Sequence, residues 1–181
     1  SHIAEHVEPW TYLKFPYLKN VGWKGFVDGK DSGVYMATPL SRLNAAVRMV
    51  ARGFGSGEAE VEAVASNLIE ANLTGHDSHG IGMLPRYTEA YLQGGLKPNT
   101  HVSTLQDSGA LLRLDGGAGF GQVIGAEAMA LAIERTREHG SCIVALGNAH
   151  HLGRIGAWAE QAAAAGLVSM HITHNTLRGL S

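Results

Sequence analysis

A short polar loop holds the first residues whose types could do chemistry. It reads His76-Asp77-Ser78-His79 and is flanked by Gly75 and Gly80. Histidine exchanges protons near neutral pH, a neighbouring Asp or Ser can fix its tautomer, and flanking glycines allow close backbone approach to a ligand. We therefore expect an acid–base or binding site, although a helix cap with solvated histidines would read the same way. A zinc site on His76 and His79 is a further alternative, but no third thiolate or carboxylate ligand is obvious.

A second histidine-rich motif reads Asn148-Ala149-His150-His151-Leu152-Gly153-Arg154. It follows an expected strand and precedes an expected helix, and ligands of α/β sheets bind at that edge. The N–H groups that begin the helix could receive a cofactor phosphate, with Arg154 adding positive charge. His150 and His151 are neighbours and cannot both face the same way, so at most one is expected to be an acid–base group. Capping or core contact remains the alternative.

A glycine motif, Gly119-x-Gly121-x-x-x-Gly125, follows a strand and opens a helix. It is one residue longer than the dinucleotide-binding fingerprint, and the next strand ends in Gly147-Asn148 instead of an acid that could bind ribose. We therefore interpret it as a tight turn with close helix packing and not as a Rossmann fingerprint.

Helix and strand signals alternate from Ala45 onward. Capping and periodicity predict helices over about 58–72, from Pro85 to Gly94, over 122–139 with Gly140 as C-cap, and over 154–165. Apolar runs predict strands over 110–114, 142–146 and 167–172. This alternation is typical of an α/β sheet covered by helices. Residues 1–44 are rich in aromatic residues and proline and are expected to be loop-rich, and 173–181 are expected to form a tail.

The composition excludes several classes of protein. The 181 residues are 45% hydrophobic and 17% charged, with a net charge of −2, which indicates a folded chain without the basic clusters that nucleic acid requires. The single cysteine, Cys142, excludes an internal disulfide and a four-thiolate metal site, and is expected to be a small buried side chain. We find no membrane-spanning stretch or signal peptide and expect a cytoplasmic location.

These motifs, taken in order, resemble the malate/L-lactate dehydrogenase family, and its hydroxycarboxylate dehydrogenases most of all. The resemblance covers about residues 47–171. It rests on the runs Ala71-Asn72-Leu73-Thr74-Gly75-His76-Asp77-Ser78-His79-Gly80-Ile81-Gly82-Met83-Leu84-Pro85-Arg86-Tyr87, Leu114-Asp115-Gly116 with Gly119-Phe120-Gly121-Gln122, and Asn148-x-x-His151-x-Gly153-Arg154-Ile155-Gly156 with Trp158-Ala159-Glu160-Gln161.

The resemblance implies a non-Rossmann α/β fold, usually dimeric, that uses NAD or NADP to interconvert 2-hydroxy acids and 2-oxo acids by hydride transfer. It implies that His151 is the acid–base group and that Ser78 and His79 line the active site beside the nicotinamide. The cofactor contacts that it implies are His79, Gly153, Arg154 and Ile155. Many family members have an arginine where this sequence has Met83, so Arg86 is the substitute considered for binding the substrate carboxylate.

The N-terminal segment resembles an internal piece of the [NiFe]-hydrogenase large subunit. The resemblance rests on the runs Glu5-His6-Val7-Glu8-Pro9-Trp10, Gly22-Trp23-Lys24-Gly25-Phe26-Val27-Asp28-Gly29 and Pro39-Leu40-Ser41-Arg42-Leu43-Asn44-Ala45-Ala46. Paired Cys-x-x-Cys thiolates are missing, so no hydrogenase metal chemistry is expected. The sequence therefore predicts a chimeric chain divided at 1–46, 47–172 and 173–181, with the dehydrogenase part truncated and the sheet incomplete at the C-terminus.

The leading hypothesis is a 2-hydroxyacid dehydrogenase that lacks part of its family's length and is not certain to turn over alone. A non-catalytic remnant or interaction fragment is the main alternative. A piece of a hydrogenase-related subunit is a third hypothesis. A metal-dependent hydrolase, built on His76, His79, His150 and His151, is a fourth.

Overall fold

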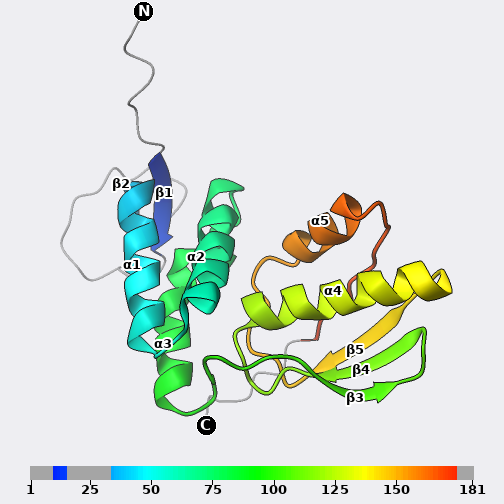
Figure 1. Cartoon of the computed structure of the whole chain (residues 1–181). Coiled ribbons are helices and arrows are strands. Elements are labelled where there is room, and N and C mark those ends of the chain that lie inside the picture. Colours follow the sequence, from blue (N-terminus) through cyan, green and yellow to red (C-terminus); the bar gives the residue numbers. More distant parts are fainter. Residues whose placement is uncertain (1–9, 16–33, 175–181) are drawn as a thin grey trace, which may run out of the picture.

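A helical half forms around α2 (Glu58–Leu73), which lies beside α1 (Leu40–Gly53) and α3 (Leu84–Leu92) (Figure 1). The computed structural model describes the backbone of residues 10–15 and 34–174 and the side chains of residues 40–174. Strands β1 (Trp10–Phe15) and β2 (Val34–Pro39) pair antiparallel next to α1. Two short 3-10 turns, η1 (Asp77–His79) and η2 (Ile81–Met83), connect α2 to α3.

Apolar residues at helical spacing explain why α2 is buried. Val61, Val64, Ala65 and Leu68 are each at most 1% exposed, and together they form a continuous stripe along the helix. Their core partners from the neighbouring elements are Leu43, Val47, Tyr87, Leu96 and Phe120. Burial of each large apolar side chain contributes about 1.5–3 kcal/mol, so this core holds α1, α3 and the start of α4 in fixed positions around α2.

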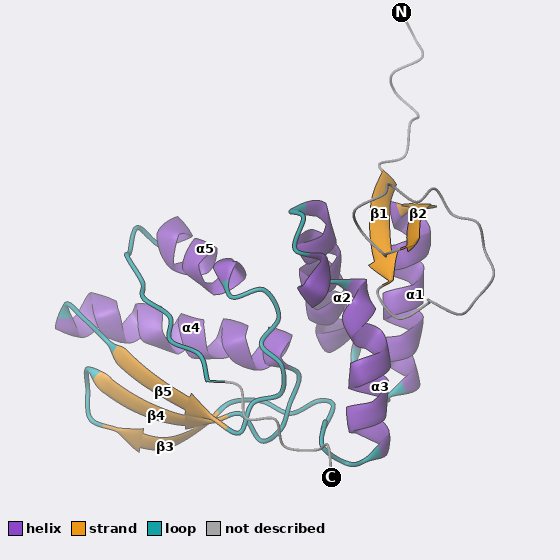
Figure 2. Cartoon of the chain, turned by 180° about the vertical axis from the view of Figure 1, so that it is seen from behind, coloured by secondary structure: helices purple, strands orange, loops and turns teal. Residues whose placement is uncertain are grey.

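A three-stranded sheet forms the other half of the molecule (Figure 2). Its order is β3 (Ser103–Asp107), β4 (Leu111–Asp115) and β5 (Ile143–Gly147). Strands β3 and β4 are antiparallel, whereas β4 and β5 are parallel and joined through α4 (Gly121–His139). Leu112 and Leu114 of β4 pack on Ala128 of α4, and α5 (Gly156–Ala164) packs against α4.

Two glycines of α4 permit close approach, as the glycine motif predicts. A Cβ at Gly121 would overlap the carbonyl oxygen of His151 and lie 2.5 Å from the Cα of Leu152. A Cβ at Gly125 would lie 2.7 Å from the ring of Trp158 in α5. The glycines therefore bring α4 against the histidine loop and α5, which confirms the packing interpretation.

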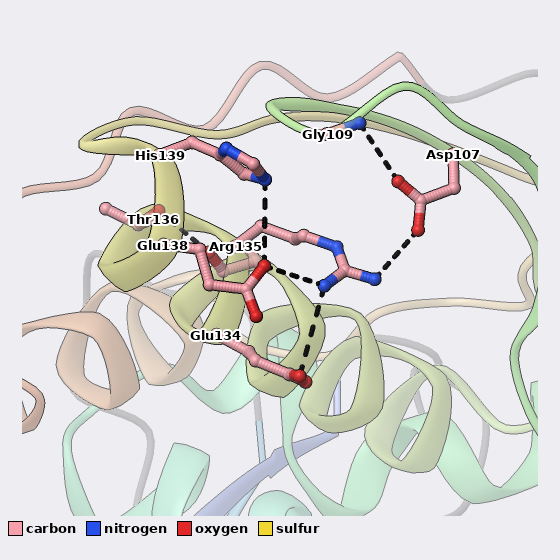
Figure 3. A network of polar contacts seen from close by, with 8 residues as sticks. Asp107, Gly109, Glu134, Arg135, Thr136, Glu138 and His139 are labelled. Carbon is pink, nitrogen blue, oxygen red and sulfur yellow. Dashed lines mark hydrogen bonds and ion pairs between the residues drawn. The ribbon is translucent and has the colours of Figure 1, made fainter.

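A polar network joins the β3–β4 hairpin to the end of α4 (Figure 3). Arg135 pairs with Asp107 at 2.7 Å and with Glu138 at 2.9 Å, and the backbone N–H of Gly109 donates to Asp107 at 3.0 Å. The helix then ends at Gly140, whose φ of 80° is left-handed and satisfies the expected C-cap. The network fixes the hairpin at the end of α4 that lies away from the histidine loops.

Most of the elements expected after residue 56 are confirmed, including α2, α3, α4, α5, β4 and β5. Cys142 packs against Leu112, Leu114 and Ala128 but is only partly buried, less than the sequence predicts. The strand expected over 167–172 is wrong. Those residues form no ladder, and the side chains of Val168, Met170 and Ile172 are exposed, because no strand in the described part of the chain lies beside them.

The expectation of a loop-rich segment over 1–44 is only partly correct, because β1, β2 and the first turn of α1 fall within it. The apolar residues of α1 face α2, a partner that local composition does not reveal. The predicted boundary near residue 46 lies inside α1, and the division of the chain stays a prediction. Expectations for 1–9, 16–33 and 175–181 lie outside the described residues. Among the described helices, none is long and apolar enough to cross a membrane.

Candidate active site

The two histidine motifs meet in space. His79 lies in η1 after α2, and His151 lies in the loop between β5 and α5. Their ring centroids are 5.0 Å apart, and the ring of His76 lies 4.6 Å from that of His79. The structure therefore brings together the loop that follows α2 and the carboxyl end of β5, the sheet edge at which α/β proteins bind ligands.

His79 is held by its neighbour Ser78. The hydroxyl Oγ of Ser78 lies 2.9 Å from Nδ1 of His79. Burial and, to a smaller extent, the charge of His76 lower the pKa of His79. A neutral imidazole next to a hydroxyl can accept or donate a proton near neutral pH.

His151 is more deeply placed. Its Nδ1 lies 2.9 Å from the hydroxyl of Tyr87 and accepts a hydrogen bond from the backbone N–H of Gly153 at 3.2 Å. Burial lowers the pKa of His151 to about 4, and the positive charges of His79 and Arg86 act in the same direction. The ring is therefore neutral at pH 7.

Tyr87 and Gln122 are site residues that sequence reasoning missed. Tyr87 is fully buried, and its hydroxyl accepts a hydrogen bond from Nε2 of Gln122 at 2.8 Å. Burial raises the pKa of Tyr87 to about 12. Both residues lie within the family-like runs, but nothing local connects positions that far apart.

The neighbouring His150 takes a different position from His151. Its ring packs edge-on against Tyr87 with centroids 5.3 Å apart, and burial lowers its pKa. The ring of His151 also lies near Tyr87, at 5.9 Å between centroids, and in addition packs against His79. That at most one of the two histidines is an acid–base group stays a prediction.

Asn72 anchors the first loop to α2. Its amide donates to Asp77 at 2.6 Å, and its carbonyl oxygen accepts from the backbone N–H of Ile81 at 2.9 Å. Of the two residues between His76 and His79, Asp77 therefore contacts Asn72, and Ser78 contacts His79. At Gly80 a Cβ would overlap the Asn72 side chain, so only glycine fits there.

Comparison with known proteins decides the family. The family model described as malate/L-lactate dehydrogenase matches residues 38–178. The chain belongs to the malate/L-lactate dehydrogenase family. Hydroxycarboxylate dehydrogenase B of Escherichia coli (strain K12) is 54% identical over 129 residues, which cover 71% of this chain and 36% of that protein. Malate dehydrogenase of Pyrococcus abyssi (strain GE5 / Orsay) is 38% identical over 152 residues, covering 84% and 41%.

Solved structures of the dehydrogenase family give the same result. A malate/lactate dehydrogenase from E. coli matches with a TM-score of 0.67 and 53% identity, covering 70% of this chain and 36% of that one. Sulfolactate dehydrogenase from Methanocaldococcus jannaschii matches with a TM-score of 0.64 and 34% identity, covering 68% and 36%. The malate/lactate dehydrogenase-like fold is therefore confirmed, and the chain spans just over a third of these relatives.

A short stretch resembles a different protein. Over 44 residues, 24% of this chain, it is 54% identical to an iron-sulfur subunit of the F420-non-reducing hydrogenase of Archaeoglobus profundus (strain DSM 5631 / JCM 9629 / NBRC 100127 / Av18) and covers 9% of that protein. This match supports the hydrogenase-like resemblance stated from the sequence. In the residues that the structure describes, no group of three or more His, Cys, Asp or Glu side chains could hold a metal ion.

Arg154, one of the residues that the resemblance to the dehydrogenases assigns to the cofactor, has acidic partners. Its guanidinium pairs with Glu160 at 2.7 Å and with Glu70 at 3.1 Å. The hydrogen bond to Glu160 is the main cause that raises the pKa of Arg154. Arg154 therefore links the histidine loop to α2 and α5, and its charge is largely balanced. Ile155 precedes the first turn of α5.

Met83, which stands where many family members have an arginine, and Arg86, the candidate for the substrate carboxylate, differ in burial. Met83, the last residue of η2, is buried in the core. Arg86 is exposed on α3, and its charge contributes to the lowered pKa of His150 and of His151. Arg86 is thus the basic side chain that acts electrostatically on the histidine cluster.

A hollow of about 410 Å³ lies on the sheet, at the carboxyl ends of β4 and β5. Its polar lining includes Arg113, Asp115 and Asn148, and Nδ2 of Asn148 donates to Asp115 at 2.9 Å. No histidine lines this hollow in the described part of the chain. Because the proposed chemistry needs side chains that can donate or accept a hydrogen at the substrate oxygen, we place the candidate active site at His79 and His151.

Proposed function

We propose that the chain forms a site of a 2-hydroxyacid dehydrogenase that interconverts 2-hydroxy acids and 2-oxo acids by hydride transfer with NAD or NADP. The observation that carries the proposal is the pairing of His79 and His151 within a member of the malate/L-lactate dehydrogenase family. Relatives with hydroxycarboxylate, malate, L-lactate and sulfolactate dehydrogenase names support the same substrate class.

His151 is the proposed acid–base group. Oxidation of an alcohol requires a group that interacts with the hydroxyl proton while hydride leaves the carbon. The lowered pKa keeps His151 neutral at working pH, and its contacts hold the ring in one orientation. His79, oriented by Ser78, completes the proposed catalytic set.

The residues proposed to hold the cofactor are His79, Gly153, Arg154 and Ile155. The chemistry of the site supports this assignment, because Oδ1 of Asn67, beside Gly153, is a buried acceptor without a described partner. Gly153 adopts a φ of 70°, and a Cβ there would overlap the side chain of Asn67. Glycine therefore lets the backbone of the loop lie directly against Asn67. When bound, the nicotinamide supplies the hydride chemistry.

Arg86 is the proposed group for the substrate carboxylate. It is the basic residue whose charge reaches His151, and a guanidinium suits a carboxylate in a bidentate arrangement. A homodimer and a cytoplasmic location complete the proposal by analogy with the family.

A second candidate function is an interaction fragment that pairs with another chain. Exposed apolar side chains support it, both on the sheet and in the segment after α5. These residues are Leu105, Leu111, Ile143, Val168, Met170 and Ile172. An apolar surface of this kind is a frequent interaction site.

A nicotinamide-binding titration separates the two functions. NADH is added to the purified chain and binding is followed by nicotinamide fluorescence for the wild type, His79→Ala, His151→Ala and the control His101→Ala. His101 is exposed and contacts Glu127 on α4, away from the cluster. We expect saturable binding that is weakened at least about tenfold, about 1.4 kcal/mol, by the first two changes only. A folded chain that does not bind NADH or NADPH would contradict the proposal and favour the interaction fragment.

A further inference from the structure

The backbone N–H of Gly153 determines which nitrogen of His151 carries the proton. A backbone amide can only donate, and this one points at Nδ1 from 3.2 Å. Nδ1 must therefore offer a lone pair. In the neutral ring, the hydrogen is then on Nε2.

This assignment fixes the direction of a longer hydrogen-bond chain. Because Nδ1 of His151 is an acceptor, the hydroxyl of Tyr87, at 2.9 Å, is the donor. The oxygen of Tyr87 then has lone pairs free for the amide Nε2 of Gln122, which donates at 2.8 Å. A hydrogen on Nδ1 would instead point at the N–H of Gly153, so the geometry selects one direction.

Burial makes the hydrogen bonds that connect Gln122, Tyr87 and His151 costly to break. Tyr87 is fully buried and Gln122 is 2% exposed. Water does not readily reach Tyr87 or Gln122 to replace a lost donor. A buried polar group without a partner costs free energy, so a tautomer of His151 that leaves one of these groups unpaired is destabilised. Both described hydrogen bonds of the His151 ring are made by Nδ1, and Nε2 has no partner among the described residues, so Nε2 is the nitrogen left for a ligand.

We propose that Gln122 is a positioning residue that acts through Tyr87 to hold His151 as the tautomer with hydrogen on Nε2. In the direction of reduction, the Nε2–H of His151 then donates a hydrogen bond to the C2 oxygen of a 2-oxo acid and polarises that carbonyl. The alkoxide that forms when hydride adds to C2 takes its proton from solvent, and in oxidation that proton returns to solvent. This role in the reaction rests on the proposed function, whereas the tautomer itself does not. A neutral imidazole used as a hydrogen-bond donor to a carbonyl has precedent in enzyme chemistry.

Nitrogen NMR of the chain labelled with [15N]histidine tests the tautomer without any need for activity. The His151 signals are assigned with His151→Gln, and spectra are compared for the wild type, Gln122→Met and the control Gln161→Met. Gln161 also donates one hydrogen bond, to the carbonyl of Ala126, but it lies away from the chain of bonds. At pH 7 we expect a protonated Nε2 and an unprotonated Nδ1 in the wild type and in the control.

In Gln122→Met we expect the two nitrogen shifts of His151 to move toward each other, as the second tautomer becomes populated. If that variant does not fold, Tyr87→Phe, which removes the donor itself, should give the same change. A protonated Nδ1 in the wild type would overturn the proposal. So would a His151 spectrum that stays unchanged in every folded variant.

Kinetics give the second readout. With a 2-oxo acid as substrate, Gln122→Met should lower kcat about tenfold, the loss of roughly one hydrogen bond in the transition state, with little change in the affinity for NADH. An unchanged kcat together with a shifted tautomer would overturn the role in positioning. A wild-type chain that shows the expected tautomer but no turnover would count against the proposed dehydrogenase function and leave the tautomer assignment confirmed.

Discussion

Replacement of Gly121 by alanine tests whether close packing of α4 positions the histidine loop. The added Cβ would overlap the carbonyl oxygen of His151 and lie 2.5 Å from the Cα of Leu152. Both contacts are backbone atoms, so a side-chain rotation cannot relieve them. Either α4 or the loop must shift.

The expected magnitude follows from two opposing effects. Overpacking of a well-packed site costs about 1–3 kcal/mol, whereas alanine in place of glycine in a helix gains up to about 1 kcal/mol. We expect Gly121→Ala to lose about 1–2 kcal/mol of unfolding free energy. Gly53→Ala is the matched control, because Gly53 ends α1, is exposed and would meet no atom within 4 Å. That change should be neutral or stabilising by up to about 1 kcal/mol.

Urea unfolding followed by circular dichroism measures both variants, and NADH titration reports on the site. Gly121→Ala should have the lower midpoint and weaker NADH binding, since the displaced loop carries His151. Equal midpoints and equal affinities for the two variants would refute the reasoning.

Three further predictions concern the charges and anchors of the site. Because the folded-state pKa of His151 lies near 4, below its ordinary value of 6.5, the unfolded chain binds the proton first, and stability should fall as the pH drops from about 6.5 to about 4. Discounted for partial exposure, the loss attributable to this ring is about 1–2 kcal/mol, and urea titrations of His151→Gln should show a correspondingly flatter pH profile. Asn72→Ala leaves Asp77 and the N–H of Ile81 without their partner and should cost about 1–3 kcal/mol of unfolding free energy. A loss smaller than about 0.5 kcal/mol, on the order of an ordinary surface change, would argue against Asn72 as the residue that anchors the loop. Glu160→Gln frees part of the charge of Arg154 and should tighten NADH binding by about two- to fivefold, whereas unchanged affinity by calorimetry would argue against a cofactor contact at Arg154.

Local sequence signals predicted the elements that carry their own start and stop residues. Helix α4 is an example, because a glycine motif precedes it and Gly140 supplies the left-handed end. The position of the second histidine loop at the edge of the sheet was also predicted, because that loop follows a strand that is parallel to its neighbour. The meeting with the first loop was not, since the first loop follows a helix. The family-like runs then indicated which histidines to consider.

The missed features depend on partners distant in the sequence. Strand β3 is exposed along its whole length and has no apolar alternation to reveal it. The apolar alternation at Val168, Met170 and Ile172 predicted a strand, but alternation alone does not supply a neighbouring strand. The bond between Tyr87 and Gln122 joins α3 to α4, so only the packed fold brings them together.

Transfer of deuterium from the nicotinamide to the product tests the proposed hydride transfer. The chain is incubated with NADH or NADPH deuterated at the transferred position and with 2-oxo acids such as pyruvate and oxaloacetate, and the products are examined by mass spectrometry. The account predicts a 2-hydroxy acid with one deuterium at C2, formed by the wild type and by His101→Ala but not by His151→Ala. Absence of the deuterated product with a folded chain that binds the cofactor would contradict the account.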